Sequence, residues 1–168
     1  SNYDASHPML KGFYYRLYAG IVYCNQYINE YGSIDAQKTA EARFLRAYQY
    51  SILMDGWGNV PFSTKVSSDK PAQIKRADLF KWIESELLDI ESSLADAKPE
   101  KEGESGYGRV DKAADWLLLS RIYLNAEIYT GTARWADAAT YSKKVIDSPF
   151  KLYTTAQNGW SAYQQLFM

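Results

Sequence analysis

The two residue types that most often build reactive sites are nearly absent from this sequence, which has one cysteine, Cys24, and one histidine, His7. A single cysteine excludes a disulfide within the chain and a cysteine-based zinc cluster. Cys24 stands among apolar residues, so we expect a buried, unreactive thiol. His7 lies in the polar opening stretch, where we expect it to be exposed and unsuited to a Ser-His-Asp or Cys-His relay. The sequence therefore predicts no such catalytic residues, no metal site and no cofactor.

The chain also lacks an excess of charge and any long apolar run. Its 19 basic and 20 acidic residues are mixed along the sequence and leave a net charge of −1. Nucleic-acid binding would need a basic face, which this pattern does not supply. No segment approaches the roughly 20 apolar residues of a membrane-spanning helix. No apolar signal-peptide region precedes Cys24, so we do not expect that residue to carry a lipid.

What the sequence does contain is helical periodicity, in a length of 168 residues that suits a single core. Between the helices we expect an extended stretch with a brief strand at 60–74 and an exposed loop at 99–108. Asp35, Asp111 and Thr132 are expected to cap the helices that follow them. One short helix is expected near Ala162. The fold class is all-α, with predicted helices at 8–31, 35–54, 78–97, 111–129 and 132–147.

The last two of these helices fit the tetratricopeptide pattern, in which small residues let paired helices approach closely. In the first of them Trp116, Leu119-Ser120 and Tyr123 occupy the expected positions. The positions matched in the second are Trp135, Ala138, Val145-Ile146 and Pro149. Ala40, Phe44 and Ala47 repeat the second-helix signature earlier in the chain. We therefore expect antiparallel helical hairpins built from degenerate repeats of this kind.

Longer motifs are more specific than this periodicity. Residues 41–48 read EARFLRAY, and eight residues later 56–62 read GWGNVPF, a glycine-rich stop that ends in proline. Further blocks follow at 108–114 (GRVDKAA), 116–119 (WLLL), 121–125 (RIYLN) and 141–148 (YSKKVIDS). In this order the motifs resemble the SusD/RagB family of outer-membrane glycan-binding lipoproteins.

The resemblance implies a fold and a role. It implies a SusD-like helical-repeat fold in which residues 1–168 form a single segment of a larger domain. The implied function is capture of oligosaccharides or polysaccharides without chemistry, for delivery to a TonB-dependent transporter of the SusC type. Members sit on the outer face of the outer membrane, held by a lipid anchor that would lie outside this segment. The blocks at 108–118 and 124–131 favour starch-like glucans as the ligand.

Several charged residues lie on helices that are otherwise built to pack. Glu41, Arg43 and Arg46 are not spaced to pair with one another, so we expect them to reach other elements. Arg46 is predicted to form a partly buried pair between helices. Arg109 and Arg121 are predicted to do the same in the second motif region. We expect these residues to be structural.

Glycoside hydrolysis needs only two carboxylates, so acidic pairs must be weighed. Glu84 with Asp89, and Glu86 with Glu91, are such pairs. Their place on an amphipathic helix indicates a solvated face, without surroundings that would raise a pKa. No phosphate-binding glycine motif is present either. We predict that the chain is not an enzyme.

Three aromatic residues outside regular helix positions are candidates for stacking on a sugar: Trp57, Tyr107 and Trp160. Packing of the turn under its helix is the favoured role for Trp57. For Tyr107 and Trp160 packing and sugar contact are about equally favoured, because an aromatic residue exposed in a loop more often has a functional reason than one on a helix. None is specific enough to define a glycan site, so the sequence leaves the glycan-binding residues unknown. The alternatives left open are a stand-alone helical-repeat scaffold for proteins and a carbohydrate-active enzyme completed by other segments.

Overall fold

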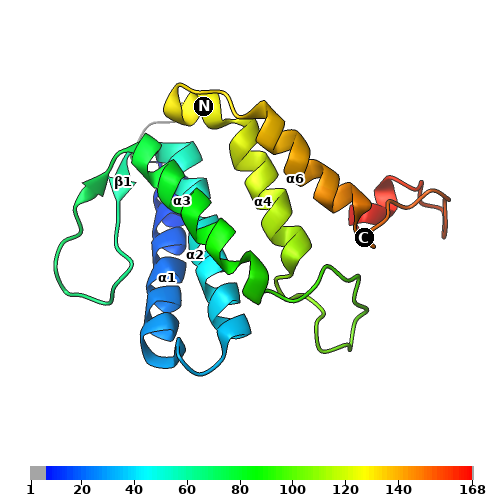
Figure 1. Ribbon diagram of the computed structural model, residues 1–168, viewed down its shortest axis with the longest axis horizontal. Coiled ribbons are helices and arrows are strands. Elements are labelled where there is room, and N and C mark those ends of the chain that lie inside the picture. Colours follow the sequence, from blue (N-terminus) through cyan, green and yellow to red (C-terminus); the bar gives the residue numbers. More distant parts are fainter. Residues whose placement is uncertain (1–6, 168) are drawn as a thin grey trace.

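Helices account for nearly all regular structure in the computed structural model, which describes residues 7–167 (Figure 1). This confirms the all-α prediction. The elements in order are α1 (Pro8–Tyr31), α2 (Ala36–Trp57), β1 (Val60–Pro61), β2 (Gln73–Ile74), α3 (Arg76–Ile90), the 3-10 turn η1 (Glu91–Ser93), α4 (Lys112–Leu124), α5 (Ala126–Thr130), α6 (Trp135–Asp147) and the 3-10 turn η2 (Gln164–Phe167).

The first hairpin consists of α1 and α2, which run antiparallel as predicted (Figure 1). The Asp35 side chain caps α2 by accepting a hydrogen bond of 3.0 Å from the Lys38 backbone N–H. Ala40, Phe44 and Ala47 are buried, as the repeat signature requires.

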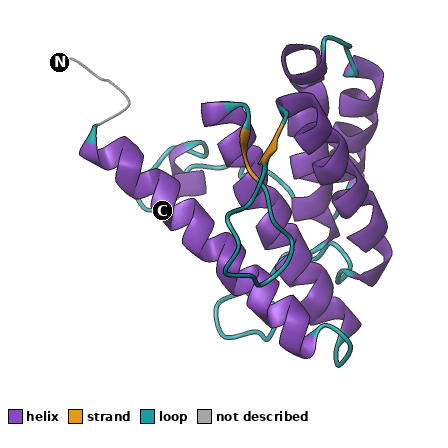
Figure 2. Cartoon of the chain, turned by 90° about the vertical axis from the view of Figure 1, so that its left-hand side faces the viewer, coloured by secondary structure: helices purple, strands orange, loops and turns teal. Residues whose placement is uncertain are grey.

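The end of α2 lies three residues beyond the predicted Met54, because Gly56 is still helical. Glycine tolerates the helical conformation at a modest entropic cost, so its presence alone does not stop a helix. The stop comes at Gly58, whose φ of 73° turns the chain out of the helix. The predicted brief strand is confirmed: Val60 pairs with Ile74 and Pro61 with Gln73, and Figure 2 shows this pair closing the base of a loop.

Helix α3 buries the predicted face but ends earlier than expected. Leu79, Ile83 and Leu87 are buried, whereas the helix stops at Ile90 rather than Ala97. The reason lies far along the chain: the Ala95 carbonyl accepts a 3.0 Å hydrogen bond from the Lys112 backbone N–H. That bond fixes the segment after η1 beside the start of α4, in extended rather than helical conformation.

The second helical region is more broken than its periodicity predicts. Asp111 caps α4 as expected, with its carboxylate accepting from the Ala114 backbone N–H at 3.0 Å. The predicted continuous helix to Tyr129 is interrupted at Asn125, where the backbone leaves the α region and α5 begins anew.

The start of α6 also differs from the prediction. Thr132 does not cap α6, which begins at Trp135 after a left-handed turn at Gly131. The short helix expected near Ala162 is confirmed as the 3-10 turn η2, which starts at Gln164.

The second hairpin joins α4 to α6, and α3 lies between the two hairpins (Figure 1). The Ser120 hydroxyl donates to the Ala138 carbonyl at 3.2 Å, so the small residues of the tetratricopeptide pattern do bring these helices together. Trp135 and Ile146 of that pattern are instead exposed. The repeat is therefore confirmed at its packing positions and wrong at these two.

Candidate functional site

A buried ionic network ties the first three helices together. Arg46 is only 5% exposed, and its guanidinium donates to Glu86 of α3 at 2.8 Å and to Asn25 of α1 at 2.9 Å. Arg43 also donates to both oxygens of the same carboxylate, at 2.7 and 3.1 Å. Burial alone would raise the pKa of Glu86, but the hydrogen bonds from the two arginines outweigh it and hold that pKa below its usual value. The predicted interhelical pair of Arg46 is confirmed.

A second ion pair connects the two long motif regions. The Arg109 guanidinium donates two hydrogen bonds, of 3.1 and 2.6 Å, to the Glu41 carboxylate. This confirms that Glu41 and Arg109 pair with other elements, but Arg109 is an exposed loop residue and not part of a buried pair between helices. Arg121 is different: it is exposed, and its guanidinium makes no ion pair with any residue in the range 7–167. The prediction of a partly buried pair is wrong for Arg121.

The acidic residues weighed as catalytic pairs are mostly structural. Glu84 accepts hydrogen bonds from the Tyr123 hydroxyl at 2.8 Å and from Arg134 at 3.0 Å. Glu91 accepts from Trp116 Nε1 and Lys144 Nζ, both at 2.8 Å, so its pKa is lowered despite its burial. The solvated face predicted from the helical pattern is therefore wrong for Glu84, Glu86 and Glu91. Asp89 alone of the four is exposed, with its carboxylate against Arg43.

Asp115 is a residue whose environment sequence reasoning missed. It is completely buried in α4, and neither carboxyl oxygen has a hydrogen-bond partner among the described residues. Burial, together with the nearby Glu91 charge, raises the pKa of Asp115 to about 8. One signal was available: Asp115 precedes Leu118 by three positions and Leu119 by four, which places it on the apolar face of the helix.

The single cysteine and the single histidine both lie in partly or fully buried positions. Cys24 is buried, as predicted, and burial raises the pKa of its thiol, which disfavours the reactive thiolate. His7 is half-buried at the start of α1 rather than fully exposed. Within the part of the chain that the structure describes, no group of three histidine, cysteine or acidic side chains is arranged to hold a metal ion.

The three aromatic candidates lie on different segments and share no ring contact within residues 7–167. Trp57 is half-buried at the end of α2 and packs against Phe13 and Tyr14 at ring-centroid distances of 6.0 and 5.4 Å. This confirms a packing role, but the ring packs on α1 and does not hold the turn under its own helix. Tyr107 is 57% exposed in the loop before α4, and Trp160 is exposed in the C-terminal tail.

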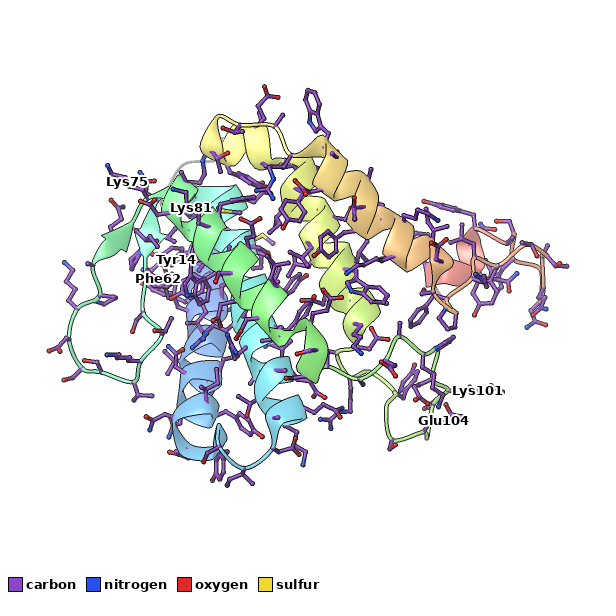
Figure 3. The ribbon with its side chains drawn as sticks, viewed as in Figure 1. Tyr14, Phe62, Lys75, Lys81, Lys101 and Glu104 are labelled. Carbon is purple, nitrogen blue, oxygen red and sulfur yellow. The ribbon has the colours of Figure 1, made fainter. Side chains whose placement is uncertain are left out.

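Tyr107 lines a cleft of about 240 Å³ between its loop and the start of the tail. Most charged groups that line this cleft already have partners: Lys98 pairs with Glu100 at 3.0 Å, Asp96 pairs with Lys112, and Arg109 pairs with Glu41. Figure 3 shows Lys101 and Glu104 further out on the same loop. The cleft offers an aromatic face but few unpaired polar groups.

Two further hollows lie beside α2. An apolar groove of about 560 Å³ runs between α1 and α2 and is lined by Phe13, Tyr23 and Leu45. A more polar cleft of about 290 Å³ opens between α2 and α4, where Asp55 and Arg121 both line it. Among the residues described, no helix combines the length and apolar character needed to cross a bilayer.

Comparison with known proteins places these features in a family. A family model named SusD-like and described as starch-binding and associating with the outer membrane matches residues 2–124. The starch-binding protein SusD of Bacteroides thetaiotaomicron is 38% identical over 159 residues, which cover 92% of this chain and 27% of that protein.

Solved structures agree with the sequence match. A SusD-like carbohydrate-binding protein from Bacteroides fragilis superimposes with a TM-score of 0.75 at 25% identity, over 88% of this chain and 29% of its own. A SusD superfamily protein from Parabacteroides distasonis gives a TM-score of 0.75 at 26% identity, over 86% of this chain and 33% of its own. The chain thus spans about a quarter to a third of the length of these relatives.

Proposed function

This chain belongs to the SusD-like family, and we propose that it is the helical-repeat part of a larger domain that captures oligosaccharides at the bacterial outer-membrane surface. The observation that carries the proposal is the 38% identity to a starch-binding protein over 92% of this chain. Starch-like glucans are accordingly the ligands we propose first. In such a role the helices position binding surfaces, and selectivity rests on which aromatic and polar groups those surfaces present.

The proposed capture involves no chemistry on the glycan. A glycosidase needs a carboxylic acid with a raised pKa beside the bond that it protonates. Glu86 and Glu91 have lowered pKa values, held by arginine and lysine partners. Asp115 has the raised pKa but is completely buried and out of reach of a polysaccharide. The electrostatics of these carboxyl groups therefore support binding over hydrolysis.

The test is calorimetric titration of the natural full-length protein with maltohexaose, followed by chromatography of the sugar. We expect saturable heat and recovery of intact maltohexaose, with no heat from a galactose-based oligosaccharide of equal length. Release of shorter sugars would indicate an enzyme. Binding of peptides without any glycan would favour the stand-alone protein scaffold.

We further propose that the protein is a RagB-type lipoprotein, anchored by a lipid outside this segment, and passes its glycan to a TonB-dependent transporter of the SusC type. The description of the family as associating with the outer membrane supports this placement. Affinity purification of the tagged protein from native outer membranes should bring down a SusC-type transporter, identified by mass spectrometry. Recovery of the protein alone, or from the aqueous fraction without lipid, would contradict the proposal.

A further inference from the structure

The polar cleft between the two hairpins has the shape and chemistry of a small ligand site. Its volume is about 290 Å³, and its walls come from α2 on one side and from α4 and α5 on the other. Tyr48, Ser51 and Asp55 line the first wall. Arg121, at the last turn of α4, and Asn125, at the junction with α5, line the second.

Several hydrogen-bonding groups of this cleft still have capacity for a ligand. The Tyr129 hydroxyl donates to one Asp55 oxygen at 2.8 Å, which orients the carboxylate. The Arg121 guanidinium makes no hydrogen bond or ion pair within the described part of the chain. Asn125 donates its amide to the Arg121 carbonyl at 3.1 Å, and its amide oxygen accepts nothing from residues 7–167. Arginine offers up to five N–H donors in a planar fork, a geometry that suits adjacent oxygen atoms.

An aromatic ring stands at the edge of the same cleft. Tyr48 is 39% exposed, and its ring lies parallel to that of Phe44, at an interplanar angle of 3° and a centroid distance of 6.3 Å. The neighbouring ring limits how Tyr48 can turn. A partly exposed aromatic face beside hydrogen-bonding groups suits a sugar ring, which has both apolar and polar faces.

The cleft around Tyr107 is the weaker candidate for the same role. There Lys98, Arg109 and their acidic partners are already engaged with one another, so a ligand would have to break existing pairs. In the cleft between the hairpins, binding to Arg121 breaks no ion pair. An unpaired guanidinium gains more from a new partner, since hydrogen bonds to charged groups are stronger than those between neutral groups.

We propose that this inter-hairpin cleft is a subsite for one ring of a neutral glucan. One carboxylate and one guanidinium balance in charge, so the cleft has no net preference for an anionic or a cationic ligand. A neutral pair of neighbouring hydroxyls can donate to Asp55 and accept from Arg121, while Tyr48 covers an apolar ring face. The subsite rests on the proposed glycan-capture function and names a place for it.

The test uses the natural full-length protein and maltohexaose, with calorimetry for affinity and hydrogen exchange for location. We expect maltohexaose to protect segments 48–55 and 118–129 from exchange. Arg121→Leu should weaken binding by about tenfold, as removal of a charged hydrogen-bond donor does. Arg121→Lys should recover only part of that loss, because lysine keeps the charge without the fork. Lys101→Ala, on the loop beyond the Tyr107 cleft, is the matched control and should leave affinity unchanged.

The outcomes separate this subsite from the general function. If maltohexaose binds but protects other segments, and Arg121→Leu binds as tightly as the wild type, glycan capture stands and the subsite is wrong. If the wild type does not bind maltohexaose, both proposals fail for this glucan. Circular dichroism of each variant identifies any loss of binding that comes from unfolding, and Arg121→Lys then serves as the decisive variant.

Discussion

Asp115 and Arg46 are charged side chains in the interior, and the structure treats them in opposite ways. Arg46 has an acidic partner, Glu86, and an amide partner, Asn25. Asp115 has no hydrogen-bond partner within the described residues and faces Glu91 of η1 as well as Lys144 and Tyr141 of α6. A buried carboxyl without a partner avoids much of its desolvation penalty by staying protonated. The two residues should therefore respond differently to pH and to substitution.

The first prediction concerns Asp115→Asn. In the folded chain the pKa of Asp115 is about 8, against an ordinary value of 3.8. Between these values the unfolded chain loses the proton and the folded chain keeps it, so Asp115 lowers stability progressively from about pH 4 to pH 8. Asparagine cannot ionise, and we expect Asp115→Asn to raise the free energy of unfolding by about 2 kcal/mol at pH 8 and little at pH 4. Urea unfolding at pH 4, 6 and 8 measures this, and an equal change at all three would contradict it.

The second prediction concerns the Arg46–Glu86 pair. Arg46→Met removes one partner of a buried ion pair and should lower the free energy of unfolding by about 3 kcal/mol. Asp89→Asn is the control. It removes the acidic partner of another ion pair, with Arg43, in which the Asp89 side chain is 67% exposed. A surface pair of that kind is worth at most about 1 kcal/mol. Equal losses in the free energy of unfolding for the two variants, measured by urea unfolding, would show that the burial of Arg46 does not strengthen its ion pair.

At the scale of elements, helix ends decide how the segments connect. Helix α2 passes through Gly56 and stops at Gly58. The two glycines differ in backbone conformation. Gly58 has a φ of 73°, whereas Gly56 is helical. A Cβ at Gly58 would approach nothing closer than Arg76 Cδ at 3.8 Å, and a Cβ at Gly56 would meet nothing within 4 Å. Space is available at both, so only conformation separates them.

The third prediction follows from this comparison. Gly58→Ala should destabilise the chain by about 1 kcal/mol, because an L-residue pays to adopt positive φ. Gly56→Ala should stabilise it by about 0.5–1 kcal/mol, since alanine is the better helix former. Thermal unfolding of both variants gives the two signs directly. A stabilising Gly58→Ala would mean that α2 does not need the left-handed turn to end.

At the scale of the whole molecule, one ion pair joins residues further apart in sequence than any other ion pair among residues 7–167. Glu41 of α2 and Arg109 before α4 are 68 positions apart and meet through two hydrogen bonds. The two motif regions that indicated the family are thus in direct contact. The pair joins the first hairpin to the loop that precedes the second.

The fourth prediction tests this connection by charge reversal. Glu41→Arg and Arg109→Glu should each lower the free energy of unfolding, and the double variant should recover part of the loss. Because Arg109 is partly exposed, the coupling should be about 0.5–1 kcal/mol. High salt should reduce it. Additive effects in the double-mutant cycle would mean that the pair contributes nothing to joining the hairpins.

The sequence alone determined the all-α class, the position of α1, a brief strand within residues 60–74, the caps at Asp35 and Asp111, and the family. These features depend on helical period, side-chain capping and motif order, which act within a few residues or can be read directly. Only the tertiary structure decided the burial of Asp115, the exposure of Arg121 and the early end of α3. Each of those depends on neighbours distant in sequence: Lys112 fixes Ala95, and the helices packed over Asp115 exclude water from it. Desolvation and ion pairing are properties of the assembled interior, so no local pattern could assign them.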